Sequence, residues 1–179
     1  GRLAAEASVA RRLGAAEGHL RLVVHRRAVD VADARFDPLR HPDAAGEVAR
    51  LIASARLFPE RAHLVGAYSL GKAQRVMALV RAAGWDRPVL MHGAMEKLTR
   101  LYEAGGLDLG DVRLVRDVPK AGLAGAIVLC PPGSMKDLWA HRFPDPVTAF
   151  ASGWMRVRAR ARQRGVELPL VISDHADWD

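Results

Sequence analysis

Along residues 40–130 the spacing of apolar residues changes several times, and this predicts strands that alternate with helices. Short runs rich in branched and apolar residues, typical of buried strands, occupy 63–68, 88–92, 112–115 and 124–130. Between them, apolar residues recur every three or four positions, as in helices with one buried face. Strands that alternate with helices form βαβ units. We therefore predict an α/β fold in three layers, with a mostly parallel sheet and helices on both of its faces.

Three helices are predicted from their apolar faces and end signals. The first begins at 41–43, where Pro and Asp suit a first turn, and ends at Phe58-Pro59. The second spans 72–83, between a tight turn at 69–71 and Gly84, and the third spans 94–104. The residues predicted to face inward are Val48, Leu51, Ile52 and Ala55, then Val76, Leu79 and Val80, then Met95, Leu98, Leu101 and Tyr102.

The last third of the chain contains two further predicted strands. They occupy 146–150 and 168–172, and a short helix is predicted at 135–142 after the loop 131–134. Met77 and Met95 are interpreted as packing residues. Residues 1–37 show no clear pattern apart from a strand-like alternation at 20–25.

Composition narrows the function classes. The 179 residues carry a formal net charge of +7, which favours a polyanionic partner such as nucleic acid, although abundant Arg and Ala can also reflect genome composition. No apolar run is long enough for a membrane span. The single cysteine, Cys130, lies in a predicted buried strand and is interpreted as a core thiol. One cysteine fits a reducing compartment, and we expect a cytoplasmic protein with no membrane partner.

The turn before the second helix is a candidate phosphate site. Residues 66–73 match the phosphate-loop pattern except at the end, where Ala73 replaces the Ser or Thr that binds magnesium, which argues against an ATPase. A helix N-terminus still offers backbone N–H groups and a positive dipole end to an anion. The alternative is a tight turn with solvated basic residues. The candidate phosphate-binding residues here are Ser69, Gly71, Lys72, Gln74 and Arg75.

A basic run is the second candidate binding site. Five arginines alternate with small or apolar residues and one Gln over 156–164, after the small-residue turn that contains Ser152. In a strand they would share one face, and they suit a phosphate backbone. The alternative is a solvated edge kept soluble by charge. We assign nucleic-acid contacts to Ser152, Arg156, Arg158 and Arg160.

The last seven residues hold the densest group of reactive side chains. Asp174, His175 and Asp177 follow the predicted strand 168–172 at once, where an α/β enzyme presents polar groups at the carboxyl end of its sheet. The alternative is a helix N-cap with His175 in the first turn. His63 and His92, at strand ends, are interpreted as hydrogen-bonded structural residues.

Three segments together resemble the metallo-β-lactamase/β-CASP nucleases, and the bacterial ligase-associated DNA exonucleases (putative mRNA 3′-end processing factors) in particular. They are 70–74, 152–155 and 173–177, and the similarity runs from about residue 40 to 179. The resemblance implies that 40–165 form a β-CASP-like cap domain and that 166–179 are a returning strand and motif B of a truncated metallo-β-lactamase αββα domain. It leaves 1–39 as a poorly matching segment, a possible remnant of the nuclease domain.

The resemblance also implies a reaction. A longer parent protein would be a metal-dependent hydrolase that cleaves phosphodiester bonds in single-stranded DNA or RNA, with DNA favoured as the substrate, in DNA repair. Its two zinc ions, or manganese, would be held by ligands outside these 179 residues. His175 would contact the scissile phosphate or protonate the leaving oxygen, with Asp174 and Asp177 beside it. A DNA ligase and a helicase would be partners, and residues 1–179 alone would be inactive.

Two alternatives from other classes remain open. The chain could be a catalytically inert nucleic-acid-binding module, which predicts salt-sensitive binding without metal-dependent cleavage. It could also be a small-molecule α/β enzyme that seats a phosphorylated metabolite at Gly71, which predicts saturable binding of a mononucleotide-sized ligand.

Overall fold

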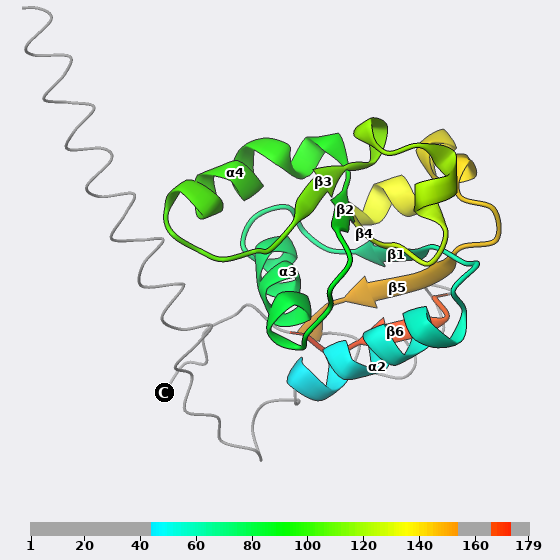
Figure 1. The fold of residues 1–179 in the computed structure, drawn as a ribbon, viewed down its shortest axis with the longest axis horizontal. Coiled ribbons are helices and arrows are strands. Elements are labelled where there is room, and N and C mark those ends of the chain that lie inside the picture. The colour runs from blue at the N-terminus through cyan, green and yellow to red at the C-terminus, as the bar shows by residue number, and fades with distance from the viewer. Residues whose placement is uncertain (1–43, 154–165, 173–179) are drawn as a thin grey trace, which may run out of the picture.

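The computed structural model describes residues 44–153 and 166–172, and these form an α/β fold around one sheet (Figure 1). The sheet has six strands in the order β3-β2-β4-β1-β5-β6, and every neighbouring pair is parallel. The strands are β1 His63–Gly66, β2 Val89–Met91, β3 Val112–Leu114, β4 Ile127–Cys130, β5 Val147–Ala151 and β6 Leu168–Leu170. The predicted parallel α/β sheet is confirmed, although most strands are shorter than the sequence runs that predicted them.

The chain fills the sheet outward in both directions from β1. It passes through α3 (Lys72–Ala82) to β2 and through α4 (Glu96–Ala104) to β3, at one edge of the sheet. It then returns to place β4 between β2 and β1, and continues to β5 on the other side of β1. Because crossover connections between parallel strands are right-handed, connections that lead toward β3 lie on one face of the sheet and connections that lead toward β6 lie on the other. The segments after β1 and β4 therefore separate to opposite faces.

The first face is covered by α-helices. α2 (Ala44–Leu57) lies beside β6 and α3, and α4 lies at the β3 side (Figure 1). The predicted apolar face of α2 is buried as expected: Val48, Leu51, Ile52 and Ala55. In α3 the prediction is correct for Val76 and Val80, whereas Leu79 is only partly buried and Met77 is fully buried. These helices and alternate strand residues form the larger of two apolar cores.

Among the described residues, the second face is covered by short 3₁₀ helices. They are η2 Val115–Asp117, η3 Lys120–Leu123, η4 Pro132–Lys136 and η5 Leu138–Arg142, and residues of η2, η3 and η5 belong to a smaller apolar core. The predicted helix at 135–142 is wrong as a single element, and the predicted loop at 131–134 is largely part of η4. Asp137 is extended, with φ −85° and ψ 169°, so no helix runs through it.

The third predicted helix differs from its prediction at its start and on its inner face. It opens with a 3₁₀ turn, η1 Gly93–Met95, before α4 begins. Leu98 and Leu101 are half-buried, whereas the polar Thr99 is completely buried. Thr99 is tolerated there because its hydroxyl accepts a hydrogen bond from Gln74 of α3, so a polar pair occupies part of the inner face.

The interpretation of Met77, Met95 and Cys130 as core residues is confirmed, since all three are fully buried. Burial raises the pKa of the Cys130 thiol to about 12, so the group stays protonated at neutral pH. Its Sγ lies 4.0 Å from the Val65 carbonyl oxygen in the next strand. Cys130 is therefore a packing residue and not a nucleophile.

Several predictions fall outside the described residues. These are the helix start at 41–43, the segment 1–37, the arginine run at 156–164 and the reactive residues at 173–179. The domain boundaries at 39–40 and 165–166 also stay predictions. None of the described helices is both long and apolar enough to cross a membrane.

Candidate functional site

The carboxyl edge of the sheet, where all six strands end, is the place to look for a ligand. In parallel sheets ligands bind where two neighbouring strands send their connections to opposite faces. Here those strands are β1 and β4, which pair in register so that Gly66 lies beside Cys130. The loop 67–71 leads from β1 to α3 on one face, and Pro131 leads from β4 to η4 on the other. The loop 67–71 is therefore the structural centre of the candidate site.

Gly71 gives this loop its shape. Its φ of 79° and ψ of −54° lie in a region that only glycine adopts readily. The Lys72 N–H donates to the Leu70 carbonyl oxygen at 3.0 Å, so Gly71 is the central residue of a strained γ-turn. Strained backbone is concentrated at functional sites, which makes the loop a candidate for function.

The backbone N–H groups of this loop are occupied by acceptors from the protein itself. The Gly71 N–H donates to Gln74 Oε1 at 2.9 Å, and the Ala73 N–H donates to the Tyr68 carbonyl oxygen at 3.1 Å. With the Lys72 N–H also paired, three of the groups expected to face an anion are not free. The prediction that they point outward unpaired is wrong, because the Gln74 side chain accepts the Gly71 N–H and two carbonyl oxygens of the loop accept the others.

Gln74 links this loop to α4. Its side chain is 0% exposed, and while its oxygen caps Gly71 its Nε2 donates to Thr99 Oγ1 at 3.2 Å. Both ends of the amide therefore bond inside the protein, which explains why an amide stands at a buried helix position. The geometry gives Gln74 a structural role, and its predicted phosphate contact stays a prediction.

The other predicted residues of this segment are brought together at the junction of the loop and α3. Ser69, Gly71 and Arg75 are half-buried, and Lys72 is only 3% exposed. The Lys72 ammonium lies 5.8 Å from the centroid of the Tyr68 ring. Their phosphate contacts stay predictions, with the buried Lys72 ammonium less accessible than the sequence suggested.

Ser152 lies on the same edge of the sheet, directly after β5. Its side chain is buried, and its N–H donates to the Leu170 carbonyl oxygen at 3.1 Å. This bond continues the pairing of β5 with β6 by one residue. β5 is the neighbour of β1, so Ser152 follows a strand adjacent to the one that leads into the loop 67–71.

Sequence reasoning missed two exposed side chains in the loop. Tyr68 is 54% exposed and Leu70 is 58% exposed. The Tyr68 ring meets the Phe150 ring edge to face, with centroids 6.5 Å apart and planes at 77°. The signal available from the sequence was an aromatic residue directly after a buried strand, and the phosphate-loop pattern drew attention to Gly71 instead.

Side chains close the space above the end of β1. A Cβ atom at Gly66 would clash with Met135 Sδ and would lie 2.9 Å from Phe150 Cδ2. Met135 belongs to η4, and Phe150 to β5. The two side chains therefore pack directly on the Gly66 backbone at the point where β1 and β4 send their connections apart, so a ligand there would meet side chains and not an open backbone.

The predicted catalytic residues Asp174, His175 and Asp177 lie outside the described residues, as do Arg156, Arg158 and Arg160. Residues 44–153 and 166–172 hold no group of three or more His, Cys, Asp or Glu side chains that could bind a metal ion. A zinc centre built from this part of the chain is therefore not supported, and the predicted metal site stays a prediction about the parent protein.

His92 follows β2 on the same edge and is held in its neutral form. Its Nδ1 accepts the Ala94 N–H at 3.0 Å, and its ring lies 4.7 Å from the Trp139 ring. Burial, followed by the nearby Arg142 guanidinium, lowers the pKa of His92. An acceptor Nδ1 at the start of η1 is a capping arrangement, which agrees with the structural interpretation of this histidine.

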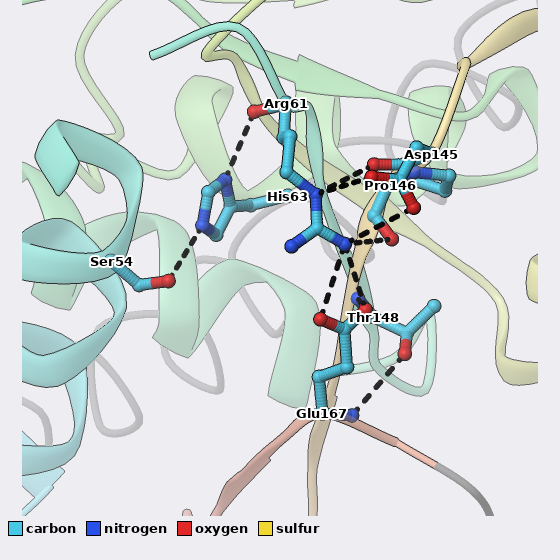
Figure 2. A network of polar contacts seen from close by, with 7 residues as sticks. All are labelled: Ser54, Arg61, His63, Asp145, Pro146, Thr148 and Glu167. Atoms are coloured by element: carbon cyan, nitrogen blue, oxygen red, sulfur yellow. Dashed lines mark hydrogen bonds and ion pairs between the residues drawn. The ribbon is translucent and has the colours of Figure 1, made fainter. Parts of the chain in front are cut away.

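The amino edge of the sheet carries a separate polar network (Figure 2). The Arg61 side chain donates to the Asp145 carbonyl oxygen at 2.8 Å and forms ion pairs with the carboxylates of Asp145 and Glu167, each at 3.1 Å. Thr148 of β5 completes it, because its Oγ1 accepts the Glu167 N–H at 3.3 Å. Arg61 thus ties together the chain segments that precede β1, β5 and β6.

His63 is a buried part of this edge. Its Nδ1 lies 3.2 Å from the Arg61 carbonyl oxygen, which can only accept, so the proton is on Nδ1. Its Nε2 then accepts the Ser54 hydroxyl of α2 at 2.8 Å (Figure 2). Burial lowers the pKa of His63. Both ring nitrogens are bonded within the protein, so His63 fits the structural interpretation.

Comparison with known proteins shows a similarity to a protein whose name indicates DNA ligation. No family model matches the chain, and no solved structure matches it. Over 111 residues, or 62% of its length, the chain is 32% identical to a protein of Opitutus terrae named "Probable DNA ligase". The aligned stretch is 10% of that protein, so the chain spans only a small part of this relative. The resemblance to the metallo-β-lactamase/β-CASP nucleases stays a prediction.

Proposed function

We propose that this chain is the nucleic-acid-binding α/β unit of a DNA-processing enzyme and that the carboxyl edge of its sheet contacts a single strand. The observation that carries the proposal is that the backbone at this edge is already bonded and covered by the protein itself. The backbone N–H groups of Gly71, Lys72 and Ala73 are paired internally, and Met135 and Phe150 pack on Gly66. What the loop offers to a ligand is its exposed side chains.

This construction favours a polymer over a phosphorylated metabolite. A metabolite gains affinity by entering a concave site that covers most of its surface. A polymer gains it from many weak contacts spread over a surface, most of them to phosphates and bases. The loop 67–71 presents an aromatic and an apolar side chain to solvent, which suits the second kind of ligand.

Charge and similarity favour DNA as that polymer. The formal net charge of +7 attracts the negatively charged phosphate backbone of a nucleic acid. The relative named "Probable DNA ligase" is a protein that by its name acts on DNA, and the similarity covers 62% of this chain. We extend the proposal to single strands, with DNA preferred over RNA, from the resemblance described above.

The proposed parent enzyme is a metal-dependent nuclease, and this chain supplies binding rather than the metal centre. The described residues do not fit a two-metal site, because none of their acidic, His or Cys side chains form a group of three. Asp174, His175 and Asp177 are near neighbours in the sequence, and a two-metal site needs ligands that converge from several loops. As the resemblance implies, the zinc or manganese ligands would come from other parts of the parent.

Salt dependence tests the binding proposal. The 179-residue chain is titrated with fluorescein-labelled (dT)20 at several salt concentrations, and the logarithm of the association constant is plotted against that of the salt concentration. Replacing Arg156, Arg158 and Arg160 with Gln should flatten the slope by about 0.7 for each phosphate that the variant no longer binds. The absence of any salt-dependent binding by the unmodified chain would refute the proposal.

Cleavage separates the nuclease parent from an inert binding module. The isolated chain should cleave no oligonucleotide with zinc, with manganese or with chelator. The parent should cleave single strands and lose about 100- to 10,000-fold in rate when His175 is replaced by Ala. A parent that binds DNA but never cleaves it would favour the inert module.

A further inference from the structure

We propose that Tyr68 is a base-stacking residue, on which a nucleobase of single-stranded DNA lies when the strand crosses the carboxyl edge. The inference rests on the proposed function and names the contact that this edge makes. Proteins that bind single strands without sequence preference combine basic residues with aromatic rings on which bases stack. Tyr68 offers such a ring, since it lies just after β1 and is 54% exposed.

The Tyr68 ring is held in place before any ligand binds. Its carbonyl oxygen accepts the Ala73 N–H of α3 at 3.1 Å, which fixes its backbone to the helix start. Its ring contacts Phe150, a buried β5 residue whose Cα pairs with that of Gly66, in an edge-to-face arrangement. A ring that is already ordered loses little conformational freedom on binding, so more of the stacking energy is realised as affinity.

A buried cation lies beside the ring. Lys72 Nζ is 5.8 Å from the centroid of the Tyr68 ring, over its face, and the Lys72 side chain is almost completely buried. Its charge therefore stays near the ring instead of moving freely in solvent. This cation–π contact helps to hold the ring in the position from which it can stack on a base.

The exposed ring and the net charge of the chain together favour a nucleic-acid strand as the occupant. An apolar protein partner could contact Leu70, which is 58% exposed, but would gain nothing from the positive charge of the chain. A DNA strand uses both the aromatic ring and that charge. The loop lies at the sheet edge where parallel α/β proteins bind ligands, and the net charge of the chain has the sign that attracts DNA.

The first test compares substitutions of Tyr68 in the 179-residue chain bound to fluorescein-labelled (dT)20. Tyr68→Ala should weaken binding about 5- to 100-fold, the loss that one stacked base typically causes. Tyr68→Leu should weaken it similarly, and Tyr68→Phe should remain within about twofold of the unmodified chain. The salt slope should not change, because no charge is removed. Leu138→Ala, at a residue of η5 that is 84% exposed, is the matched control and should bind normally.

The second test removes bases instead of the ring. An oligonucleotide with abasic sites should bind the unmodified chain more weakly, and Tyr68→Ala should cause little further loss on it. An equal Tyr68→Ala loss on both oligonucleotides would overturn the stacking assignment, as would Tyr68→Ala binding to (dT)20 as tightly as the unmodified chain does. If the unmodified chain binds no single strand, the proposed function fails together with this inference.

Discussion

The two edges of the sheet are built from similar residues and differ in what those residues do. At the amino edge, Arg61, Glu167 and His63 direct their polar atoms at other parts of the protein, and the network ties three strands and α2 together (Figure 2). At the carboxyl edge, the backbone of loop 67–71 bonds internally, whereas Tyr68 and Leu70 face solvent. Polar residues at a strand end therefore indicate function only when their bonding groups are not already used inside the protein.

The largest expected effect comes from the buried amide that supports the carboxyl edge. Gln74→Ala removes the cap on Gly71 and the bond to Thr99 and leaves a cavity, so we expect a loss of about 2–4 kcal/mol in unfolding free energy. Urea denaturation measures it. Thr99→Val, which removes one of the two bonds without a cavity, should cost about half as much or less. Equal losses would show that the cap on Gly71 contributes nothing.

The γ-turn should be the next most sensitive feature. Gly71→Ala places a side chain at φ 79°, which costs about 1–3 kcal/mol or reshapes the loop that carries Tyr68. Gly84, at the other end of α3, has φ 78° and open space where a Cβ atom would lie, so Gly84→Ala is a matched control for the backbone cost. Both variants should lower the melting temperature, and only Gly71→Ala should also weaken DNA binding.

The amino-edge network should affect stability and not binding. Arg61→Ala removes its bonds to Asp145, Pro146 and Glu167, and we expect a loss of about 1–2 kcal/mol because the two carboxylates are largely solvated. Thermal unfolding and titration with (dT)20 are measured on the same variant. A large loss of affinity with unchanged stability would reverse the roles assigned to the two edges.

The smallest expected effect is a pH dependence at the amino edge. Burial lowers the pKa of His63 below its usual 6.5, so below that pH the unfolded chain binds more protons than the folded one. This contribution to stability is fully present above pH 6.5 and is lost as the pH falls through 6.5 toward the lowered value. The melting temperature should fall between about pH 7.5 and 5.5, and His63→Gln should reduce that fall. His92, with its pKa also lowered, supplies a further part of it.

Most of the fold could be predicted from the sequence, but little of the site could. Short apolar runs identified the strands, because central strands are buried on both faces, and apolar residues at every third or fourth position identified α2, α3 and α4, because one face of each helix is buried. The second face was harder, since extended Asp137 divides η4 from η5 and no apolar period signals a 3₁₀ turn. Thr99 on an inner face could not be anticipated either, because its partner Gln74 lies 25 residues away.

The site depends on tertiary contacts that sequence patterns do not reveal. A Gly-rich turn before a helix predicts open N–H groups, and here the side chain of Gln74 closes over Gly71. The phosphate-loop-like segment begins at Gly66, and here Met135 and Phe150 fill the space over that glycine. In the first case a side chain just after the motif folds back over it, and in the second the side chains come from other elements of the fold. Residue spacing alone therefore gave the wrong geometry.

The most direct test of the central claim is the dependence of affinity on strand length. The 179-residue chain is titrated with dTMP, (dT)5, (dT)10 and (dT)20 at one fixed salt concentration. A surface that tracks a strand predicts no saturable binding of dTMP and an affinity that rises steeply with length until the surface is covered. Saturable binding of dTMP that is as tight as that of (dT)20, and that is lost in Gly71→Ala, would contradict the account and favour a metabolite site at the phosphate-loop-like turn.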